Sequence, residues 1–176
     1  MHFRARKERM TISDKQCDIM LVTSNNLLFC VGGVVELYAF NGDRLRVWRM
    51  AADVTFMKVD GGPPKSEGIL VGMANGAISK IYIQNPFPVE LLKRESAIKI
   101  ICADTSLSRT KVASVDESNR LIVTNLETQE SLFSADGVVS VCFNSEVDDM
   151  LAYTTDTSIY VVSGIGMCRC MCMPGG

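Results

Sequence analysis

The stretch MANGAISKIYI at residues 73–83 joins a polar, glycine-containing turn to an extended run rich in β-branched residues. The same pattern occurs at three other places in the chain. These copies are VGGVVELYAF (31–40), ESNRLIVTNL (117–126) and TDTSIYVVSG (155–164). The extended runs begin at intervals of 43, 43 and 38 residues, at Val34, Ala77, Arg120 and Ser158. The sequence therefore repeats one structural unit.

Each unit has room for four short strands separated by turns. In the first unit we expect strands at Ile19–Thr23, Leu27–Val31, Val34–Phe40 and Arg44–Met50. Between them lie the pairs Asn25-Asn26, Gly32-Gly33 and Asn41-Gly42, and such pairs supply the positive φ of tight hairpins. A repeat of roughly 40–45 residues with several strands is typical of a WD40-type β-propeller. Propellers have roughly 4–8 blades, and most close with more than four. We therefore predict an all-β, partial WD40-like propeller of about four blades that forms an open arc.

The period also divides the chain into segments. We expect the partial propeller over residues 1–166 and an unstructured Cys- and Met-rich tail over residues 167–176. The four blades are expected at about residues 18–50, 53–95, 97–134 and 137–163. The last blade has three strand candidates, so we predict that it is incomplete. Val89–Ile101 also contains good helix formers, but the period favours two strands joined by a turn at Glu95-Ser96.

Several expected strands are apolar on both faces, for example Ile159–Val162. A continuous apolar run is typical of a strand buried on both sides, as in stacked blades, whereas a two-sheet sandwich buries one face. An open arc leaves the outer faces of the first and last blades uncovered. On these faces we expect Leu28, Val35, Tyr153 and Ile159. We therefore predict that the chain alone does not form a well-behaved monomer.

Charge and hydropathy argue against several functional classes. The 18 basic and 20 acidic residues give a net charge of −2, whereas a nucleic-acid binder usually carries a basic stripe. No apolar run approaches the ~20 residues of a transmembrane helix, so we expect a soluble chain. The basic start, MHFRARKER, contains Arg4, Arg6, Lys7 and Arg9. No apolar or amphipathic continuation follows it, which favours a solvated segment over a targeting peptide.

The seven cysteines are an odd number, and no signal peptide precedes them. This pattern favours reduced thiols and a cytosolic compartment. Cys30, Cys102 and Cys142 lie in apolar runs, where a reduced cysteine packs as a small hydrophobic residue.

Cys168, Cys170 and Cys172 alternate in the tail, MCRCMCMPGG. Zinc sites usually combine a CxxC pair with distant ligands, and the single histidine, His2, lies at the opposite end of the chain. We therefore expect no metal ion and no cofactor. An unstructured, dispensable tail or the translated edge of a truncated gene model explains this segment better.

The inventory of catalytic residues is thin. No GxSxG, HExxH or GxxxxGK[ST] motif occurs. The acidic pairs Asp116-Glu117 and Asp148-Asp149 fall in expected hairpin turns, and adjacent strand residues point to opposite faces, so Asp148 and Asp149 are not expected to converge as a glycosidase pair. A propeller glycosidase would need inward-pointing carboxylates at equivalent positions of successive blades, and these positions hold Glu36, Lys80, Val123 and Val161. We predict no catalytic residues and no enzyme activity.

Two features allow a binding role. Trp48 lies between Arg46 and Arg49, and the sequence fits equally an exposed binding hot spot and a half-buried rim residue. Gly61–Pro64 is no phosphate loop, because no helix start or Lys-Ser/Thr follows it. We expect a loop insertion there, with Gly61–Glu67 exposed and mobile.

Residues 59–123 resemble a known family. The segment reads VDGGPPKSEGILVGMANGAISKIYIQNPFPVELLKRESAIKIICADTSLSRTKVASVDESNRLIV, and its GGPP, EG and NG elements, followed by LLK and VDE, carry the likeness. It continues through NLETQESLF and EVDDMLAYT and back to MHFRARKER, over about residues 1–155. The family is that of the WD-repeat subunit of intraflagellar transport complex A known as the 122-kilodalton subunit.

The resemblance implies a fragment of the second of two tandem propellers, which a long helical repeat region follows in that family. It implies a non-enzymatic protein-interaction scaffold in retrograde ciliary transport and cilium assembly. The expected partners are other subunits of the complex, with no nucleic acid and no small-molecule substrate, and the expected location is the cilium and the cytoplasm at the ciliary base. The alternative is a generic WD40 adaptor of a vesicle-coat or ubiquitin-ligase complex.

Overall fold

The computed structural model describes residues 16–94 and 97–165, and in this part of the chain every regular element is a β-strand. Blade 1 contains β1 (Ile19–Val22), β2 (Asn26–Val31), β3 (Val34–Ala39) and β4 (Arg44–Arg49). Blade 2 contains β5 (Val54–Val59), β6 (Gly68–Met73), β7 (Ala77–Tyr82) and β8 (Val89–Lys93). Blade 3 contains β9 (Ile100–Thr105), β10 (Lys111–Asp116), β11 (Leu121–Asn125) and β12 (Ser131–Ala135). Blade 4 contains β13 (Val138–Phe143), β14 (Met150–Thr155) and β15 (Ile159–Ser163).

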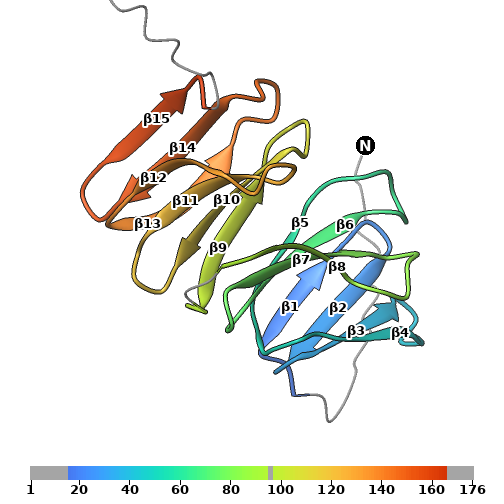
Figure 1. Ribbon diagram of the computed structural model, residues 1–176. Coiled ribbons are helices and arrows are strands. Elements are labelled where there is room, and N and C mark those ends of the chain that lie inside the picture. Colours follow the sequence, from blue (N-terminus) through green and yellow to red (C-terminus); the bar gives the residue numbers. More distant parts are fainter. Residues whose placement is uncertain (1–15, 95–96, 166–176) are drawn as a thin grey trace, which may run out of the picture.

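Each blade is an antiparallel meander in which consecutive strands pair. The first strands of successive blades lie side by side, with β5 in contact with β1 and β9, and β9 in contact with β13. Figure 1 shows the four sheets following one another from β1–β4 to β13–β15 without closing into a ring. The predicted all-β, partial propeller with an open arc is confirmed.

Local sequence explains the strand limits. Gly32 and Gly42 adopt the positive φ predicted for hairpin turns, which glycine reaches without steric cost. Asn26, in contrast, is the first residue of β2. Val89–Ile101 is not helical in its described part, because β8 and the start of β9 lie there. The division into a propeller segment and a tail stays a prediction, and residues 167–176 lie outside the described residues.

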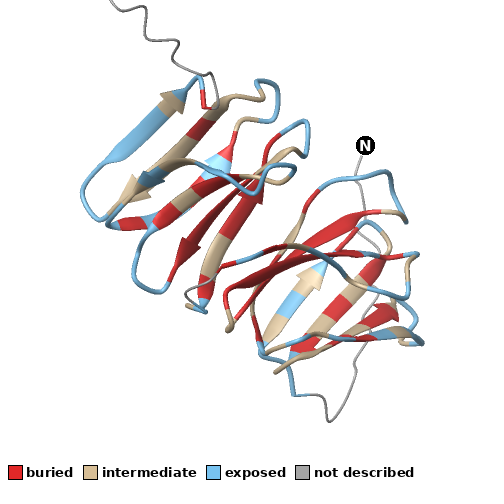
Figure 2. Cartoon of the chain, viewed as in Figure 1, coloured by how far each residue is buried: buried red, intermediate tan, exposed pale blue. Residues whose placement is uncertain are grey.

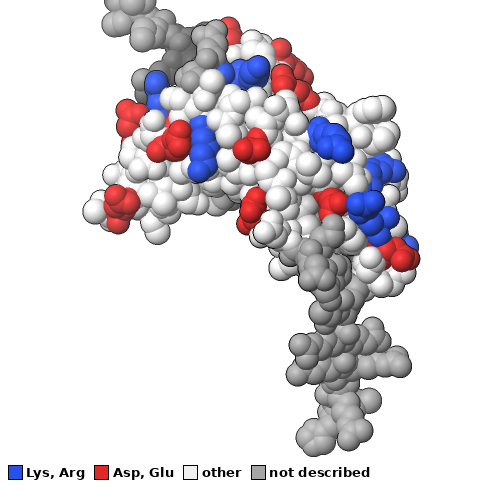
Figure 3. Space-filling model, turned by 90° about the horizontal axis from the view of Figure 1, so that it is seen from below, with Lys and Arg blue, Asp and Glu red and all other residues white. Residues whose placement is uncertain are grey.

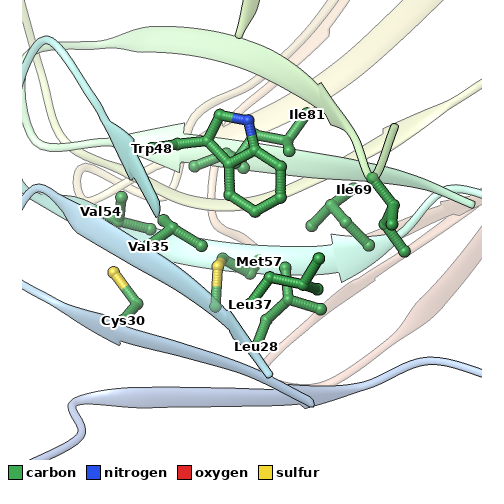
Figure 4. Packing of buried hydrophobic residues seen from close by; sticks show 11 residues of the cluster. Leu28, Cys30, Val35, Leu37, Trp48, Val54, Met57, Ile69 and Ile81 are labelled. Atoms are coloured by element: carbon green, nitrogen blue, oxygen red, sulfur yellow. The ribbon is translucent and has the colours of Figure 1, made fainter. Parts of the chain in front are cut away.

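The core consists of three apolar clusters, one between each pair of neighbouring blades. Leu28, Trp48, Met57 and Ile69 belong to the cluster between blades 1 and 2 (Figure 4). Leu70, Ile78 and Ile100 join blades 2 and 3, and Val123, Val141 and Leu151 join blades 3 and 4. Figure 2 shows β6 and most of β7 as buried, and every residue of β6 is buried. A middle strand covered on both faces explains the continuous apolar run GILVGM.

Gly72 in β6 allows blades 2 and 3 to approach closely. A Cβ atom at this position would lie 2.8 Å from the Cγ2 atom of Ile100 in β9. Any larger residue would therefore push the two blades apart.

The prediction for the uncovered faces was partly wrong. Leu28 and Val35 are fully buried and face blade 2, and Tyr153 packs against Phe133 of blade 3. Ile159 is 76% exposed, as predicted. Successive strand residues point to opposite faces, so an error of one residue exchanges the two faces. The open side of blade 1 instead has a depression lined by Gln16, Phe29, Val31, Val34 and Glu36.

Candidate functional site

The loops that join the first and second strands of the blades lie along one edge of the arc. This arrangement follows from the meander, because the first strands run side by side and end at the same edge. Contacts between the loops confirm it. The backbone N–H of Ser24 in blade 1 donates to the Glu67 carboxylate in blade 2 (3.0 Å), and the N–H of Ser108 in blade 3 donates to Asp148 in blade 4 (2.6 Å). We call this edge the loop edge.

The centre of the loop edge is a buried carboxylate, Asp60, which follows β5. Three side chains donate to it: Lys80 from β7, Thr105 from β9 and Arg109 from the β9–β10 loop. The Asp60 side chain is 2% exposed, so its charge is stabilised by these donors and not by water. The cluster thereby ties blade 2 to blade 3.

A second carboxylate, Asp104 in β9, extends the cluster in both directions along the arc. One oxygen lies 2.7 Å from the ammonium of Lys58 in β5. The other accepts a hydrogen bond from the backbone N–H of Phe143 at the end of β13 (2.8 Å). Asp104 therefore connects blade 3 with the blades on both sides of it.

A cavity of about 270 Å³ opens beside these carboxylates. The cavity is lined by residues at or just after the ends of β5, β9 and β13, the first strands of blades 2, 3 and 4. It therefore lies where these three blades meet. Its lining includes Lys58, Asp60, Asp104, Thr105, Arg109, Leu107, Phe143, Asn144 and Ser145. We call it the loop-edge cavity.

A third ionic contact joins blades 3 and 4. The ammonium of Lys111 lies 3.1 Å from an oxygen of Asp148 and 2.5 Å from an oxygen of Asp149. Burial opposes the positive charge of Lys111, but the hydrogen bonds to Asp149 and Asp148 outweigh it and raise the pKa of this ammonium. The pKa of Asp148 is lowered to about 2, chiefly because the Ser108 N–H donates to it. Both shifts favour the ionised pair at neutral pH.

The opposite ends of the strands hold one further buried ion pair. Arg94, which follows β8, donates to Asp116 at the end of β10 (2.7 Å) and to Ser114. Burial lowers the pKa of Arg94, and Asp116 opposes this shift. Its Nε atom is buried without a hydrogen-bond partner among the described residues. Arg94 is thus a second link between blades 2 and 3.

A family model described as the IFT122 second beta-propeller matches residues 1–167. The chain belongs to this family. The resemblance found in the sequence is therefore confirmed.

Individual relatives agree with the family. The Intraflagellar transport protein 122 homologs of Homo sapiens, Danio rerio and Xenopus tropicalis are 38%, 37% and 36% identical to this chain over 154 residues. The alignments cover 88% of this chain and 12–13% of each relative. The chain thus spans about one eighth of the length of these IFT122 relatives.

Trp48 is a core residue of this propeller segment. It is 1% exposed, and its indole N–H donates to the carbonyl of Asn85 at 2.9 Å. Figure 4 shows its ring among Val35, Val54, Ile69 and Ile81, between blades 1 and 2. The guanidinium of Arg46 lies 5.9 Å from the ring centre. Burial excludes the exposed hot-spot interpretation.

The geometric argument about Asp148 and Asp149 was wrong. These adjacent carboxylates do converge, because both reach the ammonium of Lys111. They lie in the β13–β14 turn, where strand alternation does not apply. Their observed contacts are those of a link between blades. Asp116, in the other acidic pair, is buried and bonded to Arg94.

The remaining predicted residues have mixed outcomes. Gly61–Lys65 are exposed as expected, but Glu67 at the end of that loop is buried. Hydrogen bonding to Ser24 lowers the pKa of Glu67. Cys30 is buried and Cys102 is partly buried, as predicted, and burial raises the pKa of Cys30 to about 11. Cys142 is exposed, because it points to the open side of blade 4.

Other predicted features lie outside the described residues: the basic start, His2, and Cys168, Cys170 and Cys172. In the part of the chain that the structure describes, no cluster of three or more His, Cys, Asp or Glu side chains could hold a metal ion. Among the same residues, no helix has the length and apolar character needed to cross a membrane.

The loop-edge cluster was not predicted from the sequence; its charged residues are Lys58, Asp60, Lys80, Asp104 and Arg109. One signal was available, because Asp60 and Asp104 are 44 residues apart, close to the repeat interval. An acidic residue that recurs at the end of the first strand in successive blades indicates a position where neighbouring blades meet.

Proposed function

We propose that this chain is a non-enzymatic protein-interaction scaffold, a segment of the second propeller of an intraflagellar transport complex A subunit. Its role would be in retrograde ciliary transport and cilium assembly. Its partners would be other subunits of that complex, in the cilium and in the cytoplasm at the ciliary base. The single observation that carries this proposal is the match of residues 1–167 to the IFT122 second propeller.

The site chemistry supports a scaffold role. The ionised side chains of the loop edge pair with one another across blade boundaries, as Asp60 with Arg109 and Lys111 with Asp149 do. Such pairs fix the relative positions of blades. Seen from below, the surface has positive and negative side chains interspersed (Figure 3), which differs from the basic stripe of a nucleic-acid binder.

A chimera tests the proposal. The matching segment of the human relative is replaced by residues 1–167 of this chain, and the chimera is expressed in ciliated cells that lack the human protein. We expect restored cilium length, normal return of cargo from the ciliary tip, and co-precipitation of complex A subunits. Tip accumulation of cargo despite normal chimera levels would contradict the proposal.

A matched variant controls for folding. Ile78→Asp places a charge in the buried cluster between blades 2 and 3, so the variant chimera should lose all three activities. Recovery of vesicle-coat or ubiquitin-ligase subunits in place of complex A subunits would favour the alternative adaptor function.

A further inference from the structure

The loop-edge cavity has positive charge on its accessible side. We propose that it is a docking site for a short acidic segment of a partner polypeptide, which places a carboxylate between Lys58 and Arg109 and an apolar side chain beside them. The inference concerns binding by this chain itself and goes beyond membership in a ciliary complex.

Charge and exposure support an anionic ligand. The cluster contains three cations, Lys58, Lys80 and Arg109, but two carboxylates, Asp60 and Asp104. The carboxylates lie beneath the surface, with side chains 2% and 10% exposed. The side chains of Lys58 and Arg109 are 42% and 44% exposed. A ligand in the cavity therefore meets the cations first.

Donor capacity leads to the same conclusion. An ammonium has three N–H donors and a guanidinium has five. The Lys58 ammonium contacts one oxygen of Asp104, and Arg109 donates to Asp60 and Thr105 through one terminal nitrogen, Nη1. A carboxylate that enters between them receives charge-assisted hydrogen bonds without displacing the buried pairs.

The backbone holds Arg109 in place. Arg109 has a φ of +63°, in the left-handed region that few non-glycine residues adopt, and its N–H donates to the carbonyl of Ser106 at 3.0 Å. Gly61 leaves room for the guanidinium, because a Cβ atom there would lie 2.8 Å from its Nη2 atom. One ligand-facing cation of the cavity is therefore already positioned before a ligand arrives.

The apolar part of the lining favours a polypeptide. Leu107 at the rim is 50% exposed, and Val59 and Phe143 lie deeper in the lining. Free phosphate would leave this apolar surface uncovered, whereas a peptide with adjacent acidic and apolar side chains would cover it.

Two acidic groups in the neighbouring β13–β14 loop already have a cationic partner within the chain. Asp148 and Asp149, in the next loop, are both paired with Lys111. Asp148 also accepts from the backbone of Ser108. Their negative charge is thus partly neutralised within blades 3 and 4.

Fluorescence anisotropy with the purified full chain tests this site. Light scattering on the same sample first determines whether the chain is a monomer or a larger assembly. The probe is a labelled peptide Gly-Leu-Glu-Glu-Leu-Gly, and the control probe carries Gln in place of both Glu residues. We expect the acidic probe alone to bind. Lys58→Gln should weaken binding about tenfold, as expected for the loss of one charge-assisted hydrogen bond, and Lys58→Arg should retain it.

Arg44→Gln is the matched control variant, because Arg44 is an exposed cation paired with Glu36 on blade 1, away from the cavity. It should bind the acidic probe as the unmodified chain does. The proposal would be overturned by equal binding of both probes, by equal weakening in Lys58→Gln and Arg44→Gln, or by no binding at all. Displacement of the peptide by an equal concentration of inorganic phosphate would also overturn it, because the cavity would then be a site for free anions. None of these outcomes bears on rescue by the chimera.

Discussion

At the scale of single residues, Asp60 is the clearest case of a side chain whose role depends on its partners. Its carboxylate is buried among donors from β7, β9 and the β9–β10 loop. Removal of one partner from a buried ion pair leaves an uncompensated charge. Lys80 would be that charge in an Asp60 variant, because it is almost fully buried in β7.

Asp60→Asn should therefore destabilise the chain by about 3 kcal/mol. The measurement is the free energy of unfolding from urea titration. Asp156→Asn is the control, since Asp156 is exposed in the β14–β15 turn. Equal unfolding free energies for the two variants would show that the buried cluster does not stabilise the fold.

Asp148 should make the free energy of unfolding depend on pH in the acid range. Its pKa is lowered from an ordinary value of 3.8 to about 2 in the fold. A lowered folded-state pKa contributes stability that is fully present above the unfolded value and is lost as the pH falls through the folded value. The contribution of Asp148 is therefore present above about pH 4 and disappears toward pH 2.

Asp148→Asn should flatten the unfolding free energy between pH 4 and pH 2 relative to the unmodified chain. The same titration at pH 7 measures the total loss of stability in the variant. An unchanged slope in the acid range would mean that Asp148 is not held by Ser108 and Lys111.

Residue roles were harder to predict than residue positions. Trp48 lies in the predicted strand, but its burial comes from packing against blade 2, where the Asn85 carbonyl, 37 residues away, accepts its indole N–H. Asp60 meets Arg109 across 49 residues, in a loop whose path no periodicity fixes. Sequence patterns report the local conformation, whereas these roles come from contacts between blades.

At the scale of elements, the backbone of the β5–β6 connection should be more accessible to a protease than the backbone of β7. Lys65 is exposed in that connection, whereas Lys80 is buried in β7, in a strand that is paired on both sides. Limited trypsin treatment should therefore cut after Lys65 before it cuts after Lys80. Timed mass spectrometry of the fragments measures the order.

Lys65→Gln provides the control for this order, because it should remove the early fragment and leave the Lys80 cleavage unchanged. Cleavage after Lys80 first would contradict the assignment of β7 as an interior strand.

The period and the turn residues predicted the strands closely, and the limits of all four strands of blade 1 lie within one residue of the predicted ones. The face that each strand presents was less predictable. In β2, Leu27, Leu28 and Phe29 are all apolar, so composition does not distinguish the face toward blade 2 from the open face. Which face is buried depends on the side of blade 1 on which blade 2 stacks, and the residues of β2 alone do not show that side.

At the scale of the whole molecule, apolar side chains remain on both open faces of the arc. Met20 is 61% exposed on blade 1, and Val161 is 67% exposed on blade 4 together with Ile159. Large exposed apolar patches promote association. The chain alone should therefore associate at micromolar concentration.

Multi-angle light scattering combined with a thermal melt measures this association. The double variant Ile159→Lys and Val161→Lys should shift the distribution toward smaller species, since charges on a strand disfavour association. A monodisperse monomer with one cooperative melting transition in the unmodified chain would contradict the prediction.

The pairing of strands in sequence order also sets how the protein forms during synthesis. Among the described strands, β1 to β15, every hydrogen-bonded pair joins consecutive strands, so each of these sheets forms its ladder without residues from another repeat. Its apolar face, however, is covered only when the next repeat of about 40 residues emerges. At translation rates of roughly 5–20 residues per second, that delay is about 2–8 s. The most recently made blade is therefore the one exposed to chaperones, and this exposed position moves along the chain as the ribosome advances.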